Sequence, residues 1–214
     1  MRDLGFDKLR TILCLGAHSD DIEIGAGGTL MTLLAERREL DVHWVVFSAG
    51  GERGGEARAS AEKLLEPAAR KTIALHNFRD TCFPFVGLEI KERFLQLQRE
   101  VQPELIFTHR REDMHQDHRL IAELTWNAFR NHLILEYEIP KYEGDLGAPN
   151  FFVPLAENLA RQKVEHLLAH FPTQREKLWF TAGTFEGLMR LRAVECNAKS
   201  GYAEAFHCRK MVWC

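Results

Sequence analysis

The sequence predicts an α/β fold in which a mostly parallel sheet is flanked by helices. Apolar runs of strand length alternate along the chain with segments whose apolar residues recur at helical spacing. The chain has 214 residues, of which 45% are hydrophobic, and this suits one domain with a sizeable core. Because no repeat, linker or low-complexity segment divides the sequence, we expect residues 1–214 to form a single domain.

The first predicted elements are a strand, a helix and a second strand. The first strand covers residues 11–16, and the second covers residues 42–47. Between them, Leu30, Leu33 and Leu34 recur at the spacing of a helix that buries one face. These three segments form one βαβ unit.

The middle of the chain repeats the alternation after a glycine-rich loop. Strands that alternate with helices favour a parallel sheet covered on both faces. In chain order we expect a loop at residues 50–55, a helix through 61–68, a strand at 72–75, a helix at 94–97, a strand at 104–108 and a helix after His118.

The last third of the chain is less regular. Residues 133–139 show partial strand alternation, and an amphipathic helix is expected over residues 159–169. Prolines and glycines punctuate the segment between them. Long irregular segments of compact domains are usually functional or mobile. The loop Asp145–Asn150 therefore either folds over a pocket or is a plain surface connection, and the sequence leaves both interpretations open.

Composition narrows the class of protein. The net charge of -3 and the pI near 6.4 argue against a nucleic-acid partner. No apolar run reaches the length of a membrane span, and the charged start Met1–Gly5 lacks the apolar core of a signal peptide. Five cysteines without a CxxC pair fit reduced thiols. We therefore expect a cytoplasmic protein.

Two polar clusters follow predicted strands. His18, Asp20 and Asp21 come after the first strand, and His115 and His118 come after the strand at 104–108. Either cluster alone is typical of a helix cap or a solvated helix face. Ligand crevices of parallel sheets, however, form at the carboxyl ends of strands. Two clusters at matching strand ends therefore indicate a metal site.

The residue types favour a catalytic metal over a structural one. Catalytic zinc takes three ligands from histidines and carboxylates and keeps a position open for water. His18, Asp21 and His118 supply such a set, and His18 and Asp21 lie three residues apart, on one side of a helical turn. Asp20 is then free to accept a proton from the metal-bound water, and His115 is placed to act as a general acid.

These residues also resemble a known family. The segments Ala17–Asp21, Gly25–Gly28 and Asp113–His118 are similar to the motifs of the LmbE/PIG-L family of zinc-dependent N-acetyl sugar deacetylases, whose signatures run AHPDD and HPDH. The resemblance covers most of the chain. It extends to Ser48–Gly54, to Lys163 with Gln174, and to Ala203–Phe206.

The resemblance implies a Rossmann-like parallel sheet, removal of an N-acyl group from an amino sugar, and zinc as the metal. It implies that His18, Asp21 and His118 are the ligands, that Asp20 is the base, and that His115 is the acid or oxyanion stabiliser. Ser19 and Gln116 stand where the family usually has proline, and this affects the rigidity of two loops rather than any ligand position.

Other residues around the predicted strand ends have candidate roles in binding. Arg53 and Arg58 lie in or near the glycine-rich loop, where a guanidinium group is placed to hold a phosphate or carboxylate of the substrate. His109 lies close enough to His115 to support a ligand. The glycines of Gly25–Gly28 do not form a GxGxxG motif, so we interpret them as sites of tight packing.

The function expected from the sequence is removal of the N-acetyl group from an N-acetylated amino sugar, either as a small molecule or in a glycoconjugate. The cofactor expected is zinc, although Fe(II) and Co(II) suit the same ligands. Two alternatives stay open: an amidase that cleaves a sugar–thiol conjugate, and an inert module that binds a sugar or nucleotide. The oligomeric state is also open, with a homo-oligomer as one option.

Overall fold

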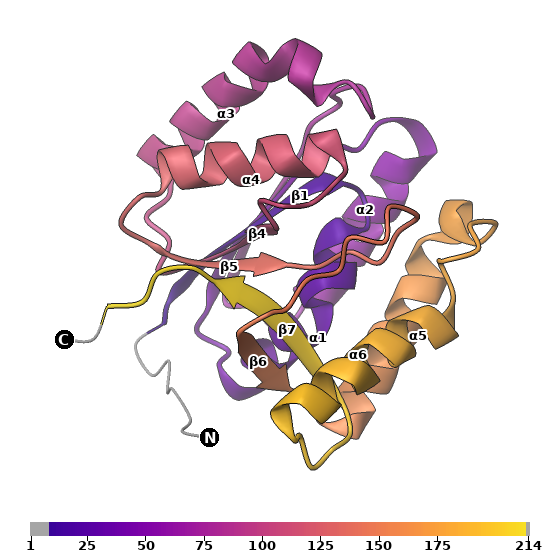
Figure 1. Cartoon of the computed structure of the whole chain (residues 1–214). Helices are drawn as coiled ribbons and strands as arrows, with labels where there is room; N and C mark the ends of the chain where they lie inside the picture. Colours follow the sequence, from indigo (N-terminus) through magenta and orange to yellow (C-terminus); the bar gives the residue numbers. More distant parts are fainter. Residues whose placement is uncertain (1–8, 213–214) are drawn as a thin grey trace.

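The computed structural model describes residues 9–212, so the charged start Met1–Gly5 and Cys214 lie outside the described residues. Within them, one seven-stranded sheet carries helices on both faces (Figure 1). The predicted α/β class with a mostly parallel sheet is confirmed. The described cysteines form no disulfide, in keeping with reduced thiols. No helix of residues 9–212 is both long and apolar enough to cross a membrane.

The first part of the chain forms the parallel part of the sheet. Its central strands β1, β2 and β4 are mostly buried and apolar, as expected for strands covered on both faces, whereas the edge strand β3 is more exposed. The elements are β1 (Thr11–His18), α1 (Asp21–Glu36), β2 (Asp41–Ser48), α2 (Gly51–Leu64), β3 (Arg70–Leu75), the 3-10 turn η1 (Phe83–Val86), α3 (Gly87–Glu100), β4 (Leu105–His109), α4 (Gln116–Ala128) and β5 (Leu133–Tyr137).

The order of the strands in the sheet places a ligand crevice beside β1. The order is β3-β2-β1-β4-β5-β7-β6. The chain winds outward from β1 through β2 to β3 and then crosses to the other side of β1 with β4. Neighbouring strands that wind in opposite directions define a topological switch point, at whose carboxyl edge ligands bind. In this protein that edge carries the ends of β1 and β4.

The end of the chain adds an antiparallel edge to the sheet. The elements here are β6 (Phe151–Pro154), α5 (Glu157–His170), the 3-10 turn η2 (Pro172–Gln174), α6 (Ala182–Cys196) and β7 (Ala203–Cys208). β7 pairs with both β5 and β6, antiparallel to each. The helix α5 was expected, whereas β6, α6 and β7 were not.

One expected loop is helical. Residues 50–55 were predicted to form a glycine-rich loop, but α2 begins at Gly51. The reason is that strong helix formers, including Glu52 and Ala57, outweigh the cost of Gly54 and Gly55 in the first turns. Arg53 and the residues after it are therefore held on a helix.

Two layers of helices cover the sheet. α3 and α4 pack on one face, while α1, α2, α5 and α6 lie on the other (Figure 1). α1 approaches the sheet closely at Gly25, where a Cβ atom would overlap the ring of Tyr137. The hydroxyl of Tyr137 donates to the Leu15 carbonyl of β1 at 2.6 Å. The tight packing expected of the α1 glycines thus places the start of this helix against the strand that precedes it.

Candidate metal centre

The two polar clusters meet at the carboxyl edge of the sheet. His18 is the last residue of β1, and Asp21 is the first residue of α1. His118 lies in the first turn of α4, which follows β4, the parallel neighbour of β1. Sheet pairing therefore brings together residues that are 100 positions apart in the sequence. All three side chains are buried.

Three side chains converge at distances that suit one metal ion. His18 Nδ1 lies 3.1 Å from His118 Nε2 and 3.4 Å from Asp21 Oδ2. His118 Nε2 lies 3.6 Å from Asp21 Oδ1. Ligand atoms about 2.0–2.2 Å from a tetrahedral zinc ion lie roughly 3.3–3.6 Å from one another. His18, Asp21 and His118 therefore lie close enough to share one metal ion, with one Asp21 oxygen facing His18 and the other facing His118.

Carboxylates also approach the other nitrogen of His18. His18 Nε2 lies 2.9 Å from Asp80 Oδ1 and 3.3 Å from Asp117 Oδ2. The Asp117 carboxylate is fixed in turn, because the backbone N–H groups of Thr81 and Phe83 donate to it at 2.7 and 3.1 Å. Asp117 is thus placed to orient the imidazole of His18 from behind, as carboxylates do for many metal-ligating histidines.

His118 is oriented in the same way. Its Nδ1 lies 3.0 Å from Asp113 Oδ2, which leaves Nε2 for the metal. Burial would raise the pKa of Asp113, but the hydrogen bond from His118 and the nearby cations hold it below its usual value. One of these cations is Lys141, whose Nζ lies 2.9 Å from Asp113 and 2.6 Å from Asp145. Burial, and then His109, lower the pKa of His118 to about 3, so the ring is neutral.

The donor atoms allow other combinations. Within the described residues, metal-ligand atoms also lie within 4.8 Å of one another in three groups that overlap with this set. These groups are His18 with His115 and His118; His18 with Asp80, His115 and Asp117; and Asp21 with His109 and His118. His109, however, accepts a hydrogen bond from the Ala17 N–H at its Nε2, at 2.9 Å, and this occupies the nitrogen that faces Asp21.

Asp20 has one carboxylate oxygen held and one free of partners. Arg53 donates to Oδ1 at 3.1 Å, while the buried Oδ2 has no hydrogen-bond partner. Burial, and then the charge of Asp21, raise the pKa of Asp20, whereas Arg53 opposes that rise. A buried acceptor without a partner is unusual in a folded protein. It marks a position where a proton donor from a ligand or water fits.

His115 is the N-cap residue of α4. Its Nδ1 accepts from the backbone N–H of Asp117 at 3.3 Å, so the neutral ring carries its proton on Nε2. The ring centre lies 4.9 Å from that of His18 and 4.6 Å from that of His118. Burial, and then the charge of His18, lower the pKa of His115. A hydrogen-bond donor therefore faces the same space as the three candidate ligands.

The structure separates the two arginines predicted to bind substrate. Arg53 lies beside the site, between Asp20 and Asp80, with 25% of its side chain exposed. Arg58 lies on the exposed side of α2, and its guanidinium group is 3.9 Å from Glu62. Substrate binding by either residue stays a prediction, and only Arg53 is placed among the other candidate residues.

Sequence reasoning missed three residues of this centre, namely Asp80, Lys141 and Asp145. Each follows the carboxyl end of a parallel strand, which was the available signal. The loop Asp145–Asn150 lies against the site, because Asp145 accepts a hydrogen bond from the Met114 N–H at 2.6 Å. Contact of this loop with a substrate stays a prediction.

Fold and site together define an α/β protein with a histidine–aspartate cluster that could hold a metal ion at the switch point of its sheet. The family model of PIG-L, described as GlcNAc-PI de-N-acetylase, matches residues 13–129, more than half of the chain. The chain therefore belongs to the PIG-L family of N-deacetylases, and the resemblance seen in the sequence is confirmed.

The three relatives described next are 21–30% identical to this chain. The uncharacterized deacetylase YaiS of Escherichia coli K12 is 30% identical over 150 residues, which cover 63% of this chain and 76% of YaiS. The N,N'-diacetylchitobiose deacetylase from Pyrococcus horikoshii has a TM-score of 0.75 at 21% identity, covering 94% of this chain and 84% of its own. The 4-carboxy-2-hydroxymuconate hydratase GalB from Pseudomonas putida has a TM-score of 0.74 at 21% identity, covering 96% and 98%. These structural likenesses concern the fold, which carries more than one reaction.

The hydrogen bond from His118 to Asp113 predicts the effect of a substitution on metal binding. Asp113→Asn removes the charge behind the His118 ring, and we expect the zinc dissociation constant to rise by about 10- to 100-fold. The measurement is competition with a fluorescent zinc chelator. Glu112→Gln, which changes the exposed neighbouring carboxylate, is the matched control and should bind zinc like the parent. Equal affinities of Asp113→Asn and parent would remove Asp113 from the centre.

Proposed function

We propose that this protein is a zinc-dependent hydrolase that removes the N-acetyl group from an N-acetylated amino sugar or its conjugate. The observation that carries the proposal is the convergence of His18, Asp21 and His118, with the unpartnered oxygen of Asp20 beside them. Family membership supports the reaction class. Fe(II) and Co(II) suit the same donor atoms, so zinc is the expected metal rather than an exclusive one.

When bound, the metal supplies a Lewis acid for the amide carbonyl and lowers the pKa of a water molecule. Asp20 acts as the general base. Arg53 donates to its Oδ1, while its buried Oδ2 has no hydrogen-bond partner. Because burial raises its pKa, this carboxylate accepts a proton more readily than an exposed aspartate does.

His115 acts on the opposite side of the reaction. The Asp117 N–H holds its Nδ1, so Nε2–H is directed as a donor. A donor in this position stabilises the oxyanion of the tetrahedral intermediate or passes a proton to the leaving amine. The products are a free amine and acetate.

The class of substrate follows from the family and from the position of Arg53. An amino sugar presents the N-acetyl group that the reaction removes, and Arg53 lies where it can hold a polar or anionic group of the conjugate. Cleavage of a sugar–thiol conjugate is the alternative, and it uses the same residues but releases no acetate. The cytoplasmic location expected from the sequence stays a prediction.

Acetate release tests the proposed function. We expect protein reconstituted with one equivalent of zinc to release acetate from at least one member of a panel of N-acetylated amino sugars and their conjugates. Removal of the metal with a chelator should abolish the release, and added zinc should restore it. A zinc-loaded protein that cleaves a sugar–thiol amide without releasing acetate would contradict the deacetylase proposal and favour the alternative.

Substitution of Asp20 and of Asp21 distinguishes the proposed general base from the proposed metal ligand. Asp20→Asn should retain zinc but lower the turnover number by roughly a hundredfold or more, as is usual for a positioned acid–base group. Asp21→Asn should lose zinc, and excess zinc should restore part of its activity. His115→Ala should resemble Asp20→Asn. The measurements are metal analysis and acetate release, with Glu52→Gln as an exposed acidic control.

An exchange of these outcomes would contradict the mechanism. If Asp20→Asn loses the metal while Asp21→Asn retains it, the two aspartates have the opposite roles.

A further inference from the structure

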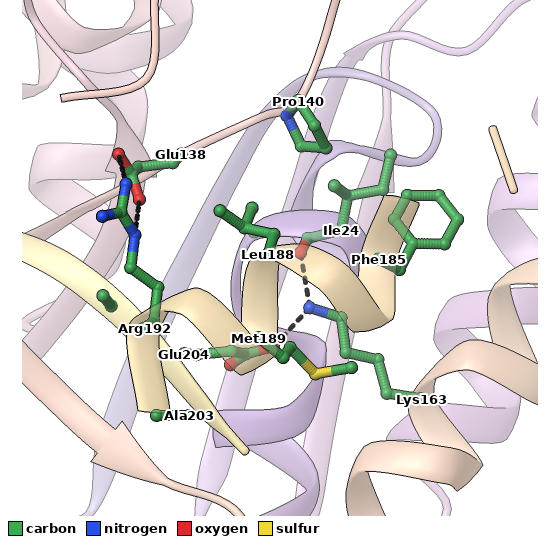
Figure 2. Close-up of a pocket in the computed structure, with 12 residues that line it drawn as sticks. Ile24, Glu138, Pro140, Lys163, Phe185, Leu188, Met189, Arg192, Ala203 and Glu204 are labelled. Atoms are coloured by element: carbon green, nitrogen blue, oxygen red, sulfur yellow. Dashed lines mark hydrogen bonds and ion pairs between the residues drawn. The ribbon is translucent and has the colours of Figure 1, made fainter. Parts of the chain in front are cut away.

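A buried ion pair forms hydrogen bonds with backbone groups of α1 (Figure 2). Lys163 comes from α5 and Glu204 from β7, and Lys163 Nζ lies 2.6 Å from Glu204 Oε1. The same ammonium group donates to the carbonyl of Ile24 at 2.6 Å. The carboxylate accepts from the backbone N–H groups of Gly28 and Thr29 at 2.8 and 2.7 Å. We call these four contacts the α1 clamp.

The α1 clamp uses backbone groups that a regular helix pairs internally. In an α-helix, the N–H groups of Gly28 and Thr29 would donate to the carbonyls of Ile24 and Gly25. Here a carboxylate accepts from both N–H groups, and an ammonium group takes the Ile24 carbonyl. These contacts attach the backbone of α1, which stays helical from Asp21 to Glu36, to α5 and β7.

The sequence of α1 makes room for the carboxylate at Gly28. A Cβ atom there would lie 3.1 Å from Glu204 Oε1 and 2.5 Å from Leu155 Cδ1. A side chain at this position would collide with Leu155 and would also crowd Glu204. A glycine in the interior of a helix is unfavourable on its own. This glycine is therefore explained by the close approach of Leu155 together with Glu204.

The Lys163 contact of the α1 clamp lies about one helical turn beyond Asp21, and its Glu204 contacts lie about two turns beyond. The helix begins at Asp21, and the Ile24 N–H donates to the Asp20 carbonyl at 3.0 Å. At the other end of this turn, the His18 N–H donates to Asp21 Oδ2 at 2.6 Å. The turn that carries Asp20 and Asp21 is therefore held by the strand on one side and by Lys163 on the other.

A buried ion pair adds little to the free energy of unfolding, so stability alone does not explain its presence. Both side chains are almost fully buried, at 5% and 3% exposure for Lys163 and Glu204. Taking two charges out of water offsets most of their attraction, and apolar residues of similar volume often stabilise a fold as well or better. Contacts to the backbone of one particular turn therefore indicate a role in positioning that turn.

We propose that Lys163 and Glu204 are positioning residues for the metal centre, and that they act through the first turn of α1 on Asp21 and Asp20. The inference rests on the proposed function, since it concerns the same metal. Ligand atoms need placement within about 0.5 Å for tight binding. Loss of the α1 clamp frees the turn, so metal affinity falls even when the fold is intact.

The test compares single and double variants. Lys163→Met leaves the charge of Glu204 buried and unpaired, so both the urea midpoint of unfolding and the zinc affinity should fall. Lys163→Met/Glu204→Gln removes both charges, and its urea midpoint should recover much of that loss. Its zinc affinity, measured by chelator competition, should stay at least about tenfold weaker than that of the parent. Lys163→Arg, which keeps a cation, should lose less affinity than Lys163→Met.

A second buried ion pair in the same cavity provides the control. Arg192 and Glu138 lie 2.9 Å apart and line the cavity shown in Figure 2, but their hydrogen bonds and ion pairs in the described part of the chain go to residues outside α1. The variant Arg192→Met/Glu138→Gln should bind zinc within about twofold of the parent. The absorption spectrum of bound Co(II), which reports coordination geometry, should change in the double variant at Lys163 and Glu204 and not in this control.

Three results would overturn the inference. One is a double variant at Lys163 and Glu204 that binds zinc as tightly as the parent. Another is an equal loss of affinity in the Arg192 and Glu138 control, which would assign the effect to general destabilisation. A parent protein that binds no zinc would overturn the proposed function, and the positioning role with it.

Discussion

The carboxylate of Asp21 is the group on which the rest of the centre depends. It is a buried negative charge that accepts the His18 N–H and lies between His18 and His118. These nearby histidines hold its pKa well below the usual value, although burial alone would raise it. A buried anion needs compensating charge and hydrogen bonds. The end of β1, the start of α1 and the start of α4 supply the hydrogen bonds and the ring nitrogens, and a divalent cation fits their common focus.

Two carboxylates beside the candidate ligands His18 and His118 explain how the orientation of these histidines is set. Asp117 stands behind His18 and is itself fixed by two backbone N–H groups. Asp113 stands behind His118 and is held by Lys141. Each imidazole thus has one nitrogen facing the candidate metal position and the other facing an anion, which is the arrangement found around metal-ligating histidines. At the same edge of the sheet, one carboxylate oxygen of Asp20 has no hydrogen-bond partner. This oxygen is the proton acceptor in the proposed reaction.

The features that could be predicted from the sequence are those that depend on residues close together in the chain. Apolar runs and helical spacing revealed the parallel strands and the first βαβ unit, and the polar residues after β1 and β4 revealed both halves of the site. Other features rest on contacts between distant segments. Lys163 forms a hydrogen bond with Ile24, which is 139 positions away in the sequence, and Glu204 forms one with Gly28, which is 176 positions away. No local pattern encodes such pairs, and for the same reason the antiparallel edge at β6 and β7 was not expected. Asp80 was missed although it follows β3, because a single aspartate in a loop carries no spacing signal.

The central claim is that His18 binds the metal through Nδ1, in company with Asp21 and His118. Anomalous diffraction at the zinc absorption edge, from crystals grown with one equivalent of zinc, tests this most directly. We expect one anomalous peak about 2.0–2.2 Å from His18 Nδ1, His118 Nε2 and a carboxylate oxygen of Asp21. A peak on the other side of the ring, beside His18 Nε2 and coordinated by Asp80 and Asp117, would contradict it.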